Sequence, residues 1–284
     1  MSFINSGQFL FELQHYPDFV LGPLQAMYGD QPKEALTGPV DFRVSLRCDS
    51  LVRRFLRPQI TFYSDQRTPF KPVARSQAFP ILEWGMNWCI AAFDHTRLIV
   101  HAAVLEKDGR AVIFPAAPGS GKSTLSAYMA FNGWNLFSDE MAIIDFASGE
   151  VAPLFRPMCL KNESITLVRK WFPDAIMTKI ARDTQKGDVA HLKALTWQQY
   201  QSLRSATITG IVFPKYRPNA ELAAHKMQQL EAFQQLCSHA FNYNVVGRAG
   251  FDLIGTLIHD TQQYTITYSD LDEVNGFLTG EFGS

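Results

Sequence analysis

Residues 114–128, FPAAPGSGKSTLSAY, carry the residue types and spacing best suited to chemistry. They match the pattern G-x-x-x-x-G-K-[ST] except at its first place, and residues 121–123, Gly-Lys-Ser, take its last three places. Ala116 stands at the first place, where the pattern has glycine. Alanine is tolerated there if the backbone needs no positive φ, because Gly119 supplies that freedom nearby.

The residue types in this motif suit phosphate binding. Gly119 and Gly121 let backbone N–H groups approach phosphate oxygens with no Cβ in the way, and the start of a helix adds a favourable dipole. Lys122 places a positive charge on the β- and γ-phosphates, and the Ser123 hydroxyl is a ligand for Mg²⁺. An ordinary turn before a helix is the alternative, but the apolar strand before the motif and the amphipathic helix after it favour phosphate binding. The residues predicted to bind the nucleotide are Pro118, Gly119, Ser120, Gly121, Lys122, Ser123 and Thr124.

A pair of carboxylates, Asp139 and Glu140, follows one predicted helix and one predicted strand beyond Lys122. In a doubly wound sheet, ligands gather at the carboxyl ends of strands, so both acids are expected near the γ-phosphate. One carboxylate can hold Mg²⁺ while the other accepts a proton from an attacking hydroxyl. Without the motif before it, the same pair would indicate only an exposed acidic strand end.

The elements that must position these residues follow from the hydrophobic pattern. Two strands joined by a turn at Asp108-Gly109 are predicted from RLIVHAAVLEKDGRAVIFPAAPG, and the second leads into the motif. A helix is expected from Lys122 to about Asn132, ended by Gly133, and then one strand over WNLFSDEMAIID. Strand, phosphate turn, helix and strand is the α/β order, here with antiparallel additions. Later elements are a helix around residues 220–242, a strand over YTITYSD and a short terminal helix.

The N-terminal part differs in composition and hydrophobic pattern. Residues 38–75 are rich in β-formers and prolines, and both DFRVSLRC and QITFYSD alternate as half-buried strands do. We therefore expect a small β-containing region over residues 1–75 and a second domain, which carries the motif, over residues 76–284. Residues 79–93, FPILEWGMNWCIAAF, are apolar all round, as a buried helix is.

Composition excludes several classes of protein. With 46% hydrophobic and 19% charged residues, the chain is globular, and a net charge of -1 gives no overall attraction for nucleic acid or anionic lipid. The basic cluster at residues 51–57 is interpreted as a solvated face. Four cysteines without a C-x-x-C pair indicate reduced thiols, with Cys89 and Cys159 in the core. No signal peptide or bilayer-spanning run is recognisable, so we expect a cytoplasmic protein with neither nucleic acid nor membrane as partner.

Residues 98–145 resemble the catalytic domain of HPr kinase/phosphorylase, and more closely its HPr-kinase-related relatives. The shared features are a strand with a histidine, a hairpin, the G-x-G-K-[ST] turn, a helix ending in glycine and an acidic pair. More remotely, the arrangement is similar to the nucleotide half of phosphoenolpyruvate carboxykinase. The resemblance implies an α/β P-loop core of HPr-kinase type with antiparallel strands. It also implies ATP- and Mg²⁺-dependent phosphorylation of a serine hydroxyl on a protein partner.

The resemblance assigns roles to individual residues. Lys122 and Ser123 match the family's nucleotide and metal residues, and the family's Asp-Asp pair becomes Asp139 and Glu140. By analogy Asp139 is the base and Glu140 a metal ligand. His101, which on an apolar strand would otherwise be a core residue, matches the family's histidine near the transferred phosphate.

Beyond residue 150 the resemblance weakens. RPMCLKNESI, residues 156–165, has no clear counterpart of the glutamate in the family's second signature, so the resemblance does not extend to phosphorolysis. Residues 156–162, 185–191 and 246–253 are nevertheless similar to segments of the related kinases, which often assemble as oligomers. These segments supply candidates for the acceptor site, Arg156, Lys161, Lys186 and His191, and for the nucleotide, Arg248. For Arg156 and Lys161 a solvated surface position is the alternative.

Four functions compete. The family favours a kinase acting on a serine or threonine of a small protein or peptide, and a kinase for a small-molecule alcohol is the alternative, because P-loop folds serve both. A GTP switch would need an Asn-Lys-x-Asp stretch, which the sequence lacks. An assembly ATPase would use Glu140 to polarise water, but the chain has no recognisable sensor sequence. We expect a kinase.

Overall fold

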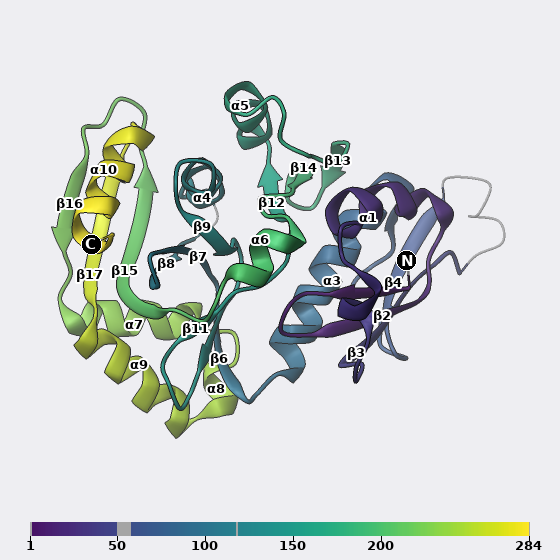
Figure 1. The fold of residues 1–284 in the computed structure, drawn as a ribbon, viewed down its shortest axis with the longest axis horizontal. Helices are drawn as coiled ribbons and strands as arrows, with labels where there is room; N and C mark the ends of the chain where they lie inside the picture. Colours follow the sequence, from purple (N-terminus) through teal and green to yellow (C-terminus); the bar gives the residue numbers. More distant parts are fainter. Residues whose placement is uncertain (1, 50–57, 118, 284) are drawn as a thin grey trace. The chain divides into compact units, whose positions relative to one another are not determined.

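The computed structural model of this chain describes residues 2–49, 58–117 and 119–283. Their strands and helices form a mixed α/β fold with several sheets, which confirms the predicted class (Figure 1). The chain divides into two compact units, Met1–Phe93 with Leu154–Tyr200 and Asp94–Pro153 with Gln201–Ser284. The basic cluster at residues 51–57 lies outside the described residues.

The first unit is built on a five-stranded sheet. Its strands, in spatial order, are β1 (Phe3–Asn5), β2 (Leu10–His15), β3 (Phe42–Arg47), β4 (Gln59–Ser64) and β5 (Val73–Ala74). Neighbouring strands are antiparallel except β2 and β3. Val44 and Leu46 of β3 are buried as predicted, but Ser45 between them is buried as well, so β3 is not the half-buried strand that its alternating pattern indicated.

A second sheet completes the first unit. It contains β12 (Met158–Lys161), β14 (Gly187–Leu192) and β13 (Ala181–Thr184), in that order. The helices that the structure describes in this unit are α1 (Leu21–Tyr28), α3 (Ala78–Phe93) and α5 (Glu163–Trp171), with short 3-10 turns at Asp18–Val20, Lys33–Leu36 and Arg75–Gln77. Helix α6 (Trp197–Ser202) begins at the end of this unit's second segment.

The unit boundaries differ from the expected boundary near residue 75. Helix α3, predicted from residues 79–93, packs on β3 and β4, so closely that a Cβ on its Gly85 would lie 2.2 Å from the ring of Phe62. Residues 154–200 join the same unit. The first unit is therefore discontinuous in sequence, a property that composition along the chain does not reveal.

The second unit is built on a six-stranded sheet. Its strands, in spatial order, are β16 (Ala223–Lys226), β17 (Gln262–Tyr268), β15 (Thr207–Tyr216), β8 (Arg110–Pro115), β7 (Ala102–Lys107) and β9 (Asn135–Ser138). Strands β17, β15 and β8 are parallel, and β7 is antiparallel to both β8 and β9. Because β9 therefore runs parallel to β8, the carboxyl ends of β17, β15, β8 and β9 meet at one edge of the sheet.

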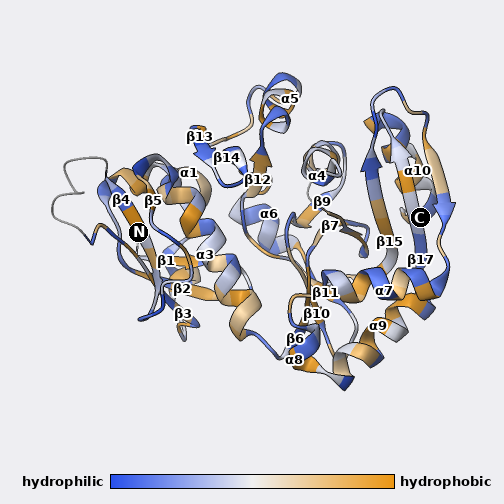
Figure 2. Cartoon of the chain, turned by 180° about the vertical axis from the view of Figure 1, so that it is seen from behind, coloured by the Kyte–Doolittle hydropathy of each residue, from blue (hydrophilic) through white to orange (hydrophobic). Residues whose placement is uncertain are grey.

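Among its described residues, a small sheet and five helices complete the second unit. The small antiparallel sheet contains β11 (Val151–Ala152), β10 (Ala142–Asp145) and β6 (Arg97–Val100). The helices are α4 (Lys122–Ala130), α7 (Gln229–His239), α8 (Tyr243–Val246), α9 (Arg248–Asp260) and α10 (Leu271–Phe282). Figure 2 shows α9 with hydrophobic and hydrophilic residues interleaved, and its Leu253, Ile254, Leu257 and Ile258 are buried in the core.

Local predictions were confirmed where short-range signals are strong. Strands β7 and β8 form the expected antiparallel hairpin, with Asp108 and Gly109 at φ of 53° and 80°. Helix α4 ends at Ala130, and Gly133 has a φ of 93° in the turn that follows. The helix expected around residues 220–242 is shorter, because residues 223–226 form β16 and α7 begins at Gln229.

Two further predictions concern the whole chain. No helix among the described residues is long and apolar enough to cross a membrane. The four cysteines carry free thiols, and Cys89 and Cys159 are buried as expected. Burial raises the pKa of the Cys89 thiol to about 11, which keeps it protonated and unreactive at neutral pH.

Candidate functional site

The glycine-rich turn, residues 116–121, connects β8 to α4 at the carboxyl edge of the six-stranded sheet. Gly119 and Gly121 have φ values of 86° and 90°, and Gly121 is the N-cap residue of α4. Ala116 is not among the described residues with positive φ, so an alanine at the first place of the motif is no obstacle. Pro118 lies outside the described residues.

The turn is packed on one side and open on the other. The backbone N–H of Tyr216 donates to the carbonyl of Ser120 at 2.9 Å. A Cβ on Gly121 would lie 2.8 Å from the Cβ of Tyr216 and 2.9 Å from the hydroxyl of Tyr268, whereas a Cβ on Gly119 would meet nothing within 4 Å. Strands β15 and β17 therefore support the turn, which leaves its Gly119 side available to a ligand.

Lys122 opens helix α4, and only 9% of its surface is exposed. Ser123 and Thr124 follow in the first turn of the helix and are half-buried. An ammonium group, a hydroxyl and the N–H groups of a helix start are thus gathered beside an open glycine turn. This donor set fits a phosphate chain with Mg²⁺, and Ser123 is the residue of the turn that could hold the metal.

The chain breaks its strand at the acidic pair. One strand was predicted over WNLFSDEMAIID, and this was wrong, because β9 ends at Ser138 and β10 begins at Ala142. The Ser138 hydroxyl accepts hydrogen bonds from the backbone N–H of Glu140 at 3.3 Å and of Met141 at 2.9 Å, which turns the chain. Since β9 pairs with β7 and β10 with β6, Asp139 and Glu140 lie where the chain passes from one sheet to the other.

His101 lies at a matching break, between β6 and β7. Val100 pairs with Ala142, so the two breaks lie next to each other. The His101 Nδ1 is 3.1 Å from the backbone carbonyl oxygen of Glu140. Because a carbonyl can only accept, this hydrogen bond requires the proton on Nδ1 and leaves the lone pair of Nε2 available.

The surroundings of His101 oppose its protonation. Burial, and then the positive charge of Lys122, lower the pKa of the His101 imidazole to about 4, while the carboxylate and carbonyl of Glu140 act in the opposite direction. His101 is therefore neutral at neutral pH. The same interactions show that Lys122, Glu140 and His101, predicted from separate parts of the sequence, are brought to one place in the second unit.

His239 is a site residue that sequence reasoning missed. It is the last residue of α7, and its backbone carbonyl accepts from the N–H of His101 at 2.7 Å. The two imidazole centroids are 6.5 Å apart. Burial and the charge of Lys122 lower the pKa of His239 as well. No motif or spacing in the sequence links residues so far apart, so only the fold identifies it.

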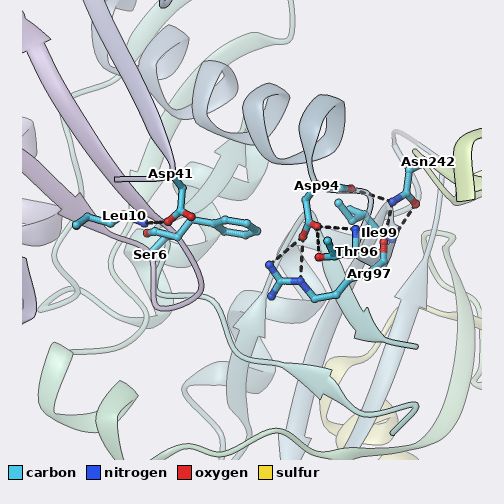
Figure 3. A network of polar contacts seen from close by, with 9 residues as sticks. Ser6, Leu10, Asp41, Asp94, Thr96, Arg97, Ile99 and Asn242 are labelled. Atoms are coloured by element: carbon cyan, nitrogen blue, oxygen red, sulfur yellow. Dashed lines mark hydrogen bonds and ion pairs between the residues drawn. The ribbon is translucent and has the colours of Figure 1, made fainter. Parts of the chain in front are cut away.

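A buried asparagine fixes the segment that follows His239. The side-chain oxygen of Asn242 accepts from the N–H of Ile99 at 3.0 Å, and its amide donates to the carbonyls of Asp94 at 3.1 Å and Arg97 at 2.7 Å (Figure 3). The Asp94 carboxylate in turn accepts from Thr96 and Arg97. Asn242, in the segment that follows α7, is thereby held against the start of β6, the strand that leads to His101.

The contacts of the other predicted site residues are with other parts of the chain. Arg248, expected to contact the nucleotide, begins α9; its side chain is 92% exposed, and its ion pair is with Asp252 at 3.3 Å on the same helix. The four acceptor-site candidates belong to the first unit, whereas the glycine-rich turn belongs to the second. They are Arg156, Lys161, Lys186 and His191.

Arg156 is buried, so the surface alternative for it is wrong. Its guanidinium lies 2.6 Å from the carboxylate of Glu83, on α3, and also donates to the Glu83 carbonyl at 2.9 Å. The hydroxyl of Tyr28 donates to the same carboxylate at 2.8 Å. Burial and the charge of Glu83 raise the pKa of Tyr28 well above its ordinary value, so it remains a hydrogen-bond donor. The sequence held no signal for this triad.

The remaining candidates have structural contacts in the first unit. The ring of His191 is 1% exposed and packs edge-on against Phe79, with centroids 5.0 Å apart. The ammonium of Lys186 lies 4.8 Å from the centroid of the Trp84 ring. Lys161 is half-buried at the end of β12, and its N–H donates to the Ser164 hydroxyl at 2.8 Å.

The metal expectation concerns Ser123 and Glu140. Within the described part of the chain, no group of three or more His, Cys, Asp or Glu side chains is arranged to hold a metal ion. A Mg²⁺ ion of the expected kind needs only one or two protein ligands, because phosphate oxygens and water supply the others. The hydroxyl in the first turn of α4 and the carboxylate at the strand break suit that chemistry.

In comparisons with known proteins, no family model matches the chain and no curated protein matches it.

Proposed function

We propose that the second unit binds the triphosphate of ATP at the glycine-rich turn and transfers the γ-phosphoryl group to a hydroxyl acceptor. The observation that carries the proposal is the contact between His101 and the Glu140 carbonyl. The Lys122 charge is near enough to lower the His101 pKa, and the contact lies at the sheet edge that carries the glycine-rich turn. Residues from three separate segments converge there. The enzyme would be a cytoplasmic P-loop kinase related to the HPr-kinase-related proteins.

Each residue has a role that follows from its position. The N–H groups of the turn and Lys122 bind the phosphate chain. Ser123 and Glu140 would hold Mg²⁺, which neutralises charge on the phosphates when it is bound. Asp139, 6% exposed beside Glu140, takes the proton of the acceptor hydroxyl. The lone pair of the neutral His101 is suited to accept a hydrogen bond from that hydroxyl.

The acceptor proposed is a serine or threonine of a small protein or peptide, and a small-molecule alcohol is the alternative. The support for a protein acceptor is the resemblance of residues 98–145 to the HPr kinases. The carboxylate and the neutral imidazole beside the phosphate site suit transfer to an alcohol of either kind.

Nucleotide binding is tested with Lys122→Ala and isothermal titration with ATP and Mg²⁺. We expect the variant to lose about tenfold or more in affinity, because a charged hydrogen bond to phosphate is removed. Lys226→Ala, at an exposed lysine on β16, is the matched control and should bind as the wild type does. A wild-type protein that does not bind ATP, or equal affinity in both variants, would contradict the proposal.

Phosphoryl transfer is tested with γ-labelled ATP and a cell lysate separated into protein and metabolite fractions. Label in the protein fraction supports a protein kinase, and label in the metabolite fraction a small-molecule kinase. Asp139→Asn should still bind ATP but transfer about 10²- to 10⁴-fold more slowly, the usual loss for a catalytic base. Transfer by this variant at the wild-type rate would refute the role of Asp139, and phosphate release with no labelled product would favour an ATPase.

A further inference from the structure

The order of the strands gives the candidate site two sides. The glycine-rich turn follows β8; on one side lie β7 and β9, with His101 and the acidic pair, and on the other lie β15 and β17. If the γ-phosphate of a bound nucleotide faces the acidic pair, the β- and α-phosphates cross the turn toward its other side. The nucleoside then lies on the side of β15 and β17.

Two tyrosines stand at the carboxyl ends of these strands. Tyr216 is the last residue of β15 and Tyr268 the last residue of β17, and their rings meet edge to face with centroids 6.0 Å apart. Tyr216 is joined directly to the turn, because its N–H donates to the carbonyl of Ser120 at 2.9 Å. Its Cβ lies where a side chain on Gly121 would have to go.

The two rings differ in exposure. Tyr268 is 1% exposed, whereas Tyr216 is 49% exposed although it is anchored at both backbone and ring. The segments after the two strands are also tied together, since the N–H of Arg217 donates to the Tyr268 carbonyl at 2.9 Å and the Ser269 hydroxyl to the Ala220 carbonyl at 2.8 Å. A fixed, solvent-facing aromatic ring beside a phosphate-binding turn is suited to stack a planar ligand.

We infer that Tyr216 is the stacking platform for the base of the bound nucleotide. The inference rests on the proposed function and adds to it the part of the site that recognises the nucleoside. Stacking on a ring tolerates any base, because every base has a π face. The site should therefore bind ATP and GTP with similar affinity, in agreement with the lack of an Asn-Lys-x-Asp stretch for reading guanine.

The test separates the base from the phosphates by using two ligands, ATP and inorganic tripolyphosphate, each titrated with Mg²⁺ into the full chain. Tyr216→Ala should weaken ATP binding by at least about fivefold, and by as much as about a hundredfold, the range expected for one base on one aromatic ring. Its affinity for tripolyphosphate should stay unchanged. Tyr216→Phe, which keeps the ring, should bind both ligands as the wild type does.

The control is Phe241→Ala. Phe241 is 51% exposed, similar to Tyr216, but its ring packs against His101 at 5.4 Å between centroids, on the other side of the turn. This variant should leave the ratio of the two affinities unchanged. If Tyr216→Ala weakens the binding of ATP and tripolyphosphate equally, or the binding of neither, the stacking platform is refuted. The proposed function is then judged separately, by the Lys122→Ala result. If the wild type binds neither ligand, the proposed function itself is refuted.

Discussion

At the scale of single residues, His101 shows how the fold sets the chemistry of a side chain. Its neutral state follows from burial and from Lys122, and its tautomer from the Glu140 carbonyl. A positively charged imidazole would repel the Lys122 ammonium and would compete with it for the negative charge of the phosphates. A neutral imidazole beside a buried ammonium leaves the positive charge of the site on the lysine.

The pKa of His101 makes the stability of the metal-free protein depend on pH. Because its pKa falls from 6.5 to about 4 on folding, the unfolded chain binds more protons between these values, and stability is lost as the pH falls through that window. Unfolding in urea should show a loss of the order of 2 kcal/mol from this residue between pH 7 and pH 5. His101→Gln should reduce that loss, and His225→Gln, at an exposed histidine on β16, should not. Equal pH dependence in all three proteins would contradict the assignment.

At the scale of elements, the glycine-rich turn depends on its support by two neighbouring strands. Both Gly119 and Gly121 have positive φ, but only Gly121 faces protein. The turn is therefore shaped by its own glycines and also by the tyrosines at the ends of β15 and β17. Gly121 is therefore both a residue of the local motif and the point where the turn contacts Tyr216 and Tyr268.

This difference predicts unequal effects of alanine at the two glycines. Gly121→Ala should destabilise the second unit by about 2 kcal/mol or more, because strain at positive φ adds to a clash with Tyr216. Gly119→Ala meets open space and should cost only the backbone strain, about 1 kcal/mol. Thermal unfolding of both variants measures the difference, and equal losses would show that the contact with Tyr216 does not shape the turn.

At the scale of the whole molecule, each of the two units is assembled from two separate stretches of chain. In the first unit, a buried ion pair joins the stretches, from Glu83 on α3 to Arg156. Burial alone would lower the pKa of Arg156, but Glu83 raises it above its ordinary value, so the pair is charged. One charge left without the other would be buried and uncompensated.

Arg156→Met should therefore destabilise the first unit strongly, by about 3–5 kcal/mol. The triple variant Tyr28→Phe/Glu83→Leu/Arg156→Met removes every member of the triad and should recover most of the loss, since a buried ion pair and an apolar replacement are often of similar stability. Urea unfolding measures both effects. A triple variant as unstable as Arg156→Met would contradict this account of the triad.

Local sequence signals were sufficient for much of the fold, and motif and resemblance together indicated the centre of the candidate site. The Asp108-Gly109 turn, the helix that begins at Lys122 and the buried helix α3 depend on neighbouring residues, because turn geometry and hydrophobic period are short-range properties. Lys122, Glu140 and His101 were recognised from motif and resemblance, and the structure brings them together.

The tertiary structure decided the rest. Asp139 and Glu140 lie at a strand break because β9 and β10 pair with strands of different sheets, and the sequence pattern does not record that change of partner. His239 meets His101, and Glu83 meets Arg156, across long stretches of chain. Which distant residues meet depends on the packing of whole elements, and no local property of the sequence encodes that packing.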